Sequence, residues 1–181
     1  MDLLFHVVGA PATVSAEVLN QFPIITIAGT GQTLPTTTPD QVLVMGSLAS
    51  GGVFVIQIEG GKRNNSGLQI DITGTKGDLK ISNGWSFQNP EDNLVEGSQA
   101  NGESLRPLAI PPHYSLLPAS DLDASVLDLA HLYAAYAHDP QEDACRAPNF
   151  ADALWLHRLI DLISQASLKG QRQILVPTNN H

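Results

Sequence analysis

The stretch Val53–Glu59 reads Val-Phe-Val-Ile-Gln-Ile-Glu and decides the fold. Its side chains alternate, and Phe54, Ile56 and Ile58 share one side of the chain. Successive residues of a strand point to opposite faces of a sheet, so a period of two is typical of a half-buried strand. This stretch therefore predicts a strand with one apolar face.

Two further alternating stretches follow, at residues 68–73 and 79–82. Glycine-rich segments separate them, at 60–67 and 74–77, and glycine supplies the positive φ that tight turns need. Short connections favour antiparallel neighbours, because a parallel crossover needs a dozen or more residues. We therefore expect an antiparallel meander over residues 42–82, with one apolar face and one polar face.

The chain before this meander holds one predicted helix and two predicted strands. Asp2–Val8 is a short apolar segment, and the following Gly9 is typical of a helix end. Alternation predicts a strand over Thr13–Leu19, and residues 41–50 form the strand that leads into the meander. Residues 23–40 are rich in proline, threonine and glycine, so we expect a loop or irregular edge there.

The chain after the meander begins with the pair Asn83-Gly84, a strong hairpin signal. We expect Trp85–Gln88 to return from that hairpin. Residues 89–102 are polar and predict a loop with an excursion through Leu94 and Val95. Leu105–Ile110 is predicted as a last strand.

Two helices are predicted near the C-terminus. Ser120 and Asp123 form a capping-box pattern for the first helix, which we expect to end by Asp139-Pro140. The second runs from Asn149 to Lys169, and Ile174–Val176 is predicted as a closing strand. A run of strands followed by a run of helices predicts the α+β class: an open, mainly antiparallel sheet with helices packed on one face.

The composition limits the classes of function. The 181 residues, 43% of them hydrophobic, suffice for a single domain over residues 1–181. A net charge of −9 repels phosphate backbones and anionic lipid, so we expect neither nucleic-acid nor membrane binding. One cysteine, Cys145, excludes an internal disulfide and is typical of a cytoplasmic protein.

No catalytic constellation is evident in the sequence. The glycine segments at 29–31 and 74–77 lack the spacing of nucleotide-binding loops and are typical of turns. Five possible metal ligands lie near the end of the first C-terminal helix: His138, Asp139, Glu142, Asp143 and Cys145. Their spacing fits no recurrent metal site, so we expect no metal. On chemistry alone the chain is a binding or scaffold domain.

Three segments together resemble a known family. They are Asp2–Gly9 with Thr13–Ala16, then Val53–Gly61 with Ile70–Leu79, and then Pro148–Ala153 continuing to Lys169-Gly170. In this order and spacing they are similar to the C-terminal domain of the glucose-fructose oxidoreductase/inositol dehydrogenase (Gfo/Idh/MocA) family. The segment Gly60–Lys62 and the segment Pro112–Tyr114 resemble the branch of the fungal galactose-regulon repressor and its bacterial relatives.

The resemblance implies that a Rossmann domain normally precedes this chain, which contains no dinucleotide-binding domain of its own. It places the catalytic lysine and histidine of the family upstream of Met1, so we expect no catalytic residue here. No cofactor is expected in this chain, and NAD or NADP is expected in the full-length parent. Candidate substrate-facing residues are Asp2, His6 and Lys62. The alternatives are a structural histidine in an apolar helix for His6 and a solvated loop tip for Lys62.

Two functions from different classes follow from the resemblance. In the leading hypothesis the parent is a cytoplasmic NAD(P)-dependent oxidoreductase acting on a sugar or polyol, and this chain supplies the substrate-side wall and the oligomer interface. In the alternative, the parent is a ligand-sensing regulator that keeps the fold without the chemistry. A free-standing oligomerisation module is a third reading.

The face of the predicted sheet that carries Val53, Val55, Gln57 and Glu59 is mixed in character. It is too apolar for a fully solvated surface and too polar for a second core. Such a surface is typical of a contact between two copies. We therefore expect a homodimer or a dimer of dimers through the sheet, with the residues Gln69, Asp71 and Thr73 on the same face.

Overall fold

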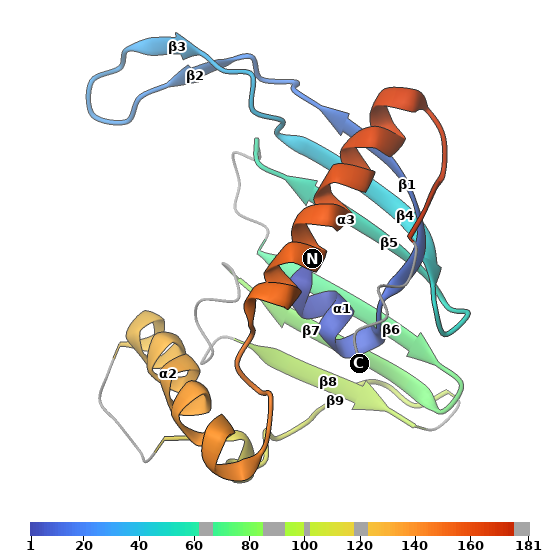
Figure 1. Cartoon of the computed structure of the whole chain (residues 1–181), viewed down its shortest axis with the longest axis vertical. Helices are drawn as coiled ribbons and strands as arrows, with labels where there is room; N and C mark the ends of the chain where they lie inside the picture. Colours follow the sequence, from blue (N-terminus) through green and yellow to red (C-terminus); the bar gives the residue numbers. More distant parts are fainter. Residues whose placement is uncertain (62–66, 85–92, 100–101, 118–122, 176–181) are drawn as a thin grey trace. The chain divides into compact units, whose positions relative to one another are not determined.

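The computed structural model describes residues 1–61, 67–84, 93–99, 102–117 and 123–175 (Figure 1). The chain divides into two compact units, the first made of Met1–Arg63 with Phe150–His181 and the second of Asn64–Asn149. Strand pairs in both units are antiparallel, which confirms the predicted α+β class. The expectation of a single domain stays a prediction.

The first unit is built on a four-stranded sheet in the order β10-β1-β4-β5. Its strands are β1 (Pro11–Leu19), β4 (Gln41–Leu48), β5 (Val53–Glu59) and β10 (Gln173–Ile174). The predicted strands over β1, β4 and β5 are confirmed. The closing strand predicted over Ile174–Val176 is found one residue earlier, as β10, which pairs with β1 at Thr13 and Val14; Val176 lies outside the described residues.

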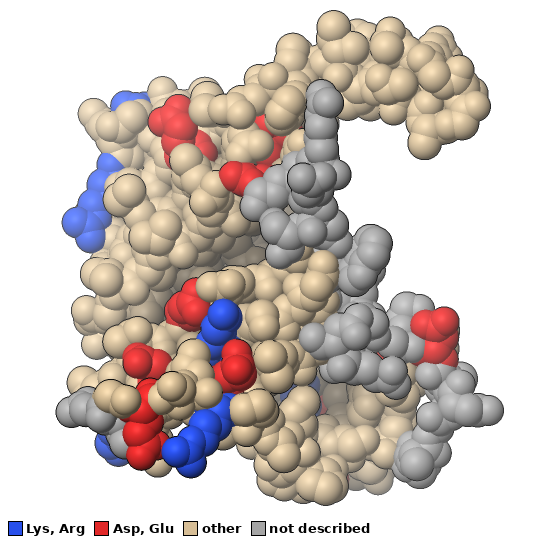
Figure 2. Space-filling view, turned by 180° about the vertical axis from the view of Figure 1, so that it is seen from behind, with Lys and Arg blue, Asp and Glu red and all other residues tan. Residues whose placement is uncertain are grey.

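Residues 23–40, which the sequence predicts to be a loop or irregular edge, contain a hairpin. It is made of β2 (Ile24–Thr26) and β3 (Thr33–Pro35). The prediction gave too much weight to the prolines and too little to the β-branched residues of both strands. All six strand residues are exposed, and Figure 2 shows the hairpin free of charged side chains, as its sequence requires.

The base of this hairpin is fixed by Asp40. Its two carboxylate oxygens accept hydrogen bonds from the backbone N–H of Gln21 at 3.1 Å and of Phe22 at 2.7 Å. On the opposite side, the Asn20 side chain donates to the carbonyl of Thr36 at 2.7 Å. These bonds close the connection between β1 and β4 below the hairpin.

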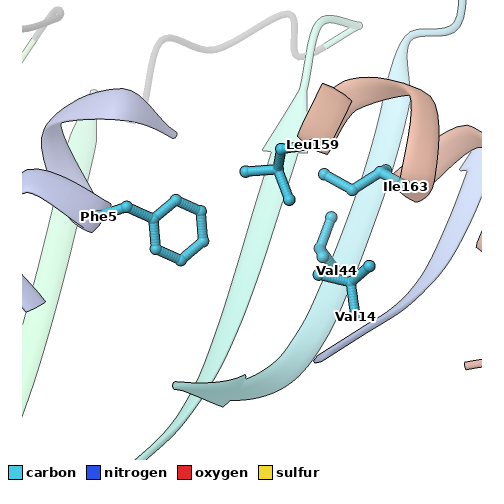
Figure 3. Packing of buried hydrophobic residues seen from close by; sticks show 5 residues of the cluster. All are labelled: Phe5, Val14, Val44, Leu159 and Ile163. Atoms are coloured by element: carbon cyan, nitrogen blue, oxygen red, sulfur yellow. The ribbon is translucent and has the colours of Figure 1, made fainter. Parts of the chain in front are cut away.

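Helix α3 (Phe150–Lys169) covers one face of this sheet. Leu159 and Ile163 from the helix and Val14 and Val44 from the sheet are almost completely buried together (Figure 3). The predicted inward face of β5 is confirmed for Phe54 and Ile56, which pack against this cluster, whereas Ile58 near the end of the strand is 43% exposed. The apolar core of the first unit therefore lies between α3 and the sheet.

Gly46 in β4 allows two elements to approach closely. A Cβ atom at this position would lie 1.9 Å from the carbonyl oxygen of Thr13 and 2.9 Å from the ring of Phe54. Only glycine leaves room for both. The phenyl ring therefore crosses the strand where a side chain would otherwise stand, and reaches the core.

Helix α1 (Asp2–Val8) confirms the predicted first helix. It ends at Gly9, whose φ of 90° is readily reached by glycine and whose N–H donates to the carbonyl of Phe5. The buried ring of Phe5 contacts two other rings edge to face: Phe54 at 5.1 Å and Trp155 at 6.1 Å between ring centroids. These three aromatic rings pack α1 against the core.

The second unit contains a separate sheet in the order β6-β7-β8-β9. Its elements are β6 (Leu68–Gly74), β7 (Gly77–Asn83), β8 (Leu94–Ser98), β9 (Arg106–Pro107), the 3-10 helix η2 (Pro112–Tyr114) and helix α2 (Ala124–Glu142). The hairpin β6-β7 is as predicted, but β5 and β6 belong to different sheets. The expectation of one continuous meander is therefore wrong after β5, and Gln69, Asp71 and Thr73 do not share a sheet with Val55.

Three other expectations for this unit change. The segment at Leu94 and Val95 is the strand β8, paired with β7, rather than an excursion in a loop. The last predicted strand is reduced to β9, and Pro140 lies inside α2 instead of ending it. Trp85–Gln88 and Ser120 lie outside the described residues. Within the described part, no helix is long and apolar enough to cross a membrane.

We predict that Leu159→Ala lowers the free energy of unfolding by about 2–5 kcal/mol, because it removes a fully buried side chain and leaves a cavity. Leu159 is 1% exposed, whereas Leu168 in the same helix is 86% exposed. Leu168→Ala is therefore the matched control, with an expected change within about 0.5 kcal/mol. Urea denaturation followed by circular dichroism measures both, and equal effects would contradict the core described above.

Candidate functional site

Two of the three predicted substrate-facing residues lie together on α1. Asp2 and His6 are one helical turn apart and both are exposed, so they share a face of the helix. Phe5 turns the other way and holds the helix against the core. The third candidate, Lys62, lies outside the described residues. The substrate-facing role of all three stays a prediction.

Two acidic side chains near the end of α2, Asp139 and Glu142, bind the turn that follows the helix. The Asp139 carboxylate accepts hydrogen bonds from the backbone N–H of Arg146 at 2.9 Å and of Ala147 at 2.8 Å. Glu142 accepts a hydrogen bond from the Arg146 side chain, and its other oxygen lies 3.5 Å from Nδ1 of His138. In the described part of the chain, no three His, Cys, Asp or Glu side chains are placed to hold a metal ion.

These contacts change the acidity of both carboxyl groups. The N–H groups of Ala147 and Arg146 hold the pKa of Asp139 below its ordinary value of 3.8. The hydrogen bond from Arg146 lowers the pKa of Glu142 from its ordinary value of 4.5. Both groups are thus stabilised as carboxylates, which suits a structural role in the turn rather than proton transfer near neutral pH.

The surface of the first sheet that faces away from α3, here called the outer face, is the second candidate site. Strand pairing arranges its residues in four rows: Ile174, Thr13, Ser47 and Val53; then Ser15, Met45 and Val55; then Glu17, Leu43 and Gln57; then Leu19, Gln41 and Glu59. The centre is apolar and open, with Met45 59% and Val55 77% exposed. Figure 2 views this side, where uncharged residues cover most of the sheet.

One arginine lies at the first row of the outer face. The guanidinium of Arg172, from the segment before β10, donates to the hydroxyl oxygens of Thr13 and Ser47. The two hydroxyl groups are themselves 2.7 Å apart. Arg172 is therefore fixed over the hydroxyl groups while remaining exposed to solvent.

The sequence predicted part of this face. Val53, Val55, Gln57 and Glu59 lie on it as expected, because β5 alternates clearly. Leu43 and Met45 were missed, because β4 has apolar residues on both faces and its sequence does not indicate which face is buried. Arg172 was missed because its partners Thr13 and Ser47 are distant in the sequence.

Comparisons with known proteins agree with the fold and the family expectation. Residues 1–83 match the family described as Gal80p, C-terminal domain. The galactose/lactose metabolism regulatory protein GAL80 of Saccharomyces cerevisiae is 31% identical, in a match covering 77% of this chain and 40% of that protein. Over these residues the chain is similar to the Gal80p C-terminal domain. The resemblance predicted from the sequence is thereby confirmed.

Solved structures show the same fold as this chain. A super-repressor mutant of Gal80p from Saccharomyces cerevisiae matches with a TM-score of 0.76 and 24% identity, over 96% of this chain and 47% of that one. Levoglucosan dehydrogenase in complex with NADH and L-sorbose matches with a TM-score of 0.74 and 19% identity, over 97% and 48%. The chain thus spans less than half the length of the proteins it matches.

We predict that Asp139→Ala accelerates hydrogen exchange at the amides of Arg146 and Ala147 near neutral pH, because both lose their acceptor. The folded pKa of Asp139 is lowered, so its stabilising contribution is present above 3.8 and is lost as the pH falls through the folded value. In the unmodified chain, protection of the Arg146 and Ala147 amides against exchange should therefore decrease only as the pH falls below 3.8.

Asp128→Ala, an exposed substitution in the same helix, is the matched control. It removes one negative charge and leaves the acceptor in place. Equal exchange rates at the two amides in Asp139→Ala and Asp128→Ala would contradict the structural role of Asp139.

Proposed function

We propose that this chain is the domain through which a dehydrogenase-like protein associates and against which its sugar-like ligand lies. The observation that carries the proposal is the outer face of the first sheet. Val53, Val55 and Met45 stand open there, at 84%, 77% and 59% exposure. Exposed apolar groups gathered on one face with a polar rim are typical of a protein interface.

The ligand side of the proposal rests on α1. A carboxylate and an imidazole on one helix face, Asp2 and His6, offer acceptors and donors for sugar hydroxyl groups. Phe5 fixes the helix from beneath, so both side chains start from a rigid backbone. Lys62 completes the proposed set from the sequence alone.

For the activity of the larger protein, our first candidate is an NAD(P)-dependent oxidoreductase acting on a sugar or polyol in the cytoplasm. The fold shared with levoglucosan dehydrogenase, which was solved with NADH, supports it. In such a protein a dinucleotide-binding domain supplies the cofactor and the proton-transferring residues, while this chain binds and orients the substrate.

The second candidate is a ligand-sensing regulator without turnover. It is favoured by the 31% identity to a galactose/lactose metabolism regulatory protein, because that relative is matched by sequence as well as fold. The two candidates separate in one experiment on the full-length protein with NAD(P) and a panel of sugars. Reduction of NAD(P) in the presence of a sugar indicates the enzyme. Binding of a sugar without reduction of NAD(P) indicates the regulator.

We predict that this chain forms a dimer at micromolar concentration and that Val55→Arg shifts it toward the monomer. Val55 lies in the middle of the outer face, so two copies would bring two like charges together. Multi-angle light scattering measures the change. Leu168→Arg, at an exposed position of α3, introduces the same charge elsewhere and should leave the dimer intact. A monomer in the unmodified chain would refute the proposed interface.

We also predict that this chain alone binds NADH more weakly than about 100 μM, or about −5.5 kcal/mol. The reason is that its sequence has no glycine-rich turn between a strand and a helix to receive a pyrophosphate. Calorimetric titration with NADH tests this. Tighter binding would move the cofactor site into this chain and would change the proposed division of roles.

A further inference from the structure

The outer face has an uneven distribution of charge along its strands. Its arginine, Arg172, lies at the first row, over Thr13 and Ser47. Two acids lie toward the other end: Glu17 in the third row and Glu59 in the fourth. The second row between them is uncharged, with Ser15, Met45 and Val55. The face therefore has a basic end and an acidic end, separated by an apolar centre.

If two copies pair through this face, as proposed above, a two-fold axis lies in the plane between the sheets, and its direction decides which rows meet. An axis parallel to the strands sets the first row against the first row. Arg172 would then face the partner copy's Val53 or Arg172, leaving a guanidinium buried without a carboxylate. Glu17 would face the third row of the partner copy, where it meets Leu43, Gln57 or a second Glu17 and no basic side chain.

An axis across the strands, placed over the second row, sets the first row against the third. Arg172 of each copy then lies opposite Glu17 of the other, and this pairing occurs twice. Met45 and Val55 meet their own copies at the centre. Rows are about 7 Å apart and facing sheets about 10 Å apart, a gap that an arginine and a glutamate side chain together can span.

We infer that two copies of this chain associate with their strands antiparallel across the outer face, and that Arg172 of one copy pairs with Glu17 of the other. The inference rests on the proposed association and adds its orientation. Charge complementarity carries it, since opposite charges at an interface fix the register and like charges oppose wrong pairings. The occupant is a second copy, because the same face supplies both halves of the pair.

A charge exchange tests the pairing. Glu17→Arg and Arg172→Glu, each alone, should raise the dimer dissociation constant at least about tenfold, because each sets two like charges against one another. The double variant should return it to within about threefold of the unmodified chain. Sedimentation equilibrium measures all four constants. Losses that add in the double variant, or single variants without effect, would overturn the pairing.

Arg158→Glu, on the exposed surface of α3, is the matched control for the change in net charge and should leave the constant unchanged. The outcomes also separate the inference from its premise. If the unmodified chain is a monomer, both fail. If it is a dimer that ignores the charge exchange, the interface stands and only its orientation is wrong.

Cross-linking gives a second reading that does not depend on charge. In a Cys145→Ser background, which removes the exposed native thiol, single cysteines are placed at Val55 and at Ser47. A short bis-maleimide should join two copies through Val55→Cys and not through Ser47→Cys, because only the second row meets itself. An axis along β4 predicts the reverse, so efficient cross-linking at Ser47→Cys alone would refute the inference.

Discussion

The burial of α3 against one face of the first sheet is the contact on which the first unit depends. Leu159 and Ile163 meet Val14 and Val44, and each fully buried side chain of this size contributes about 1.5–3 kcal/mol. The helix comes from the end of the chain and the strands from its beginning. The first unit is therefore discontinuous, and it becomes complete only when the two ends of the chain have met.

Local sequence patterns predicted the structure correctly where a pattern has a single physical cause. The alternation in β5 predicted the inward and outward faces over Val53–Gln57, because a period of two places neighbouring side chains on opposite sides of the sheet. Gly9 and Gly170 marked the ends of α1 and α3, and both have the positive φ that favours glycine. The candidate residues on α1 came instead from family resemblance.

Local signals failed where distant parts of the chain decide the outcome. The residues of β5 and β6 do not indicate that the two strands belong to different sheets, because strand pairing also depends on the neighbouring strands, β4 and β7. The outer face gained Leu43, Met45 and Arg172 only through strand register and through contacts between distant segments. Pro140 shows a milder failure, because the last turn of a helix continues despite one missing N–H group.

The bonds around Asp40 have a consequence for how this fold can vary. They close the link between β1 and β4 beneath the hairpin, and the register of these two strands involves no residue of β2 or β3. Lengthening an already closed loop costs little free energy. We therefore expect segments of different length and composition in place of residues 23–35 to leave the core of the first unit unchanged.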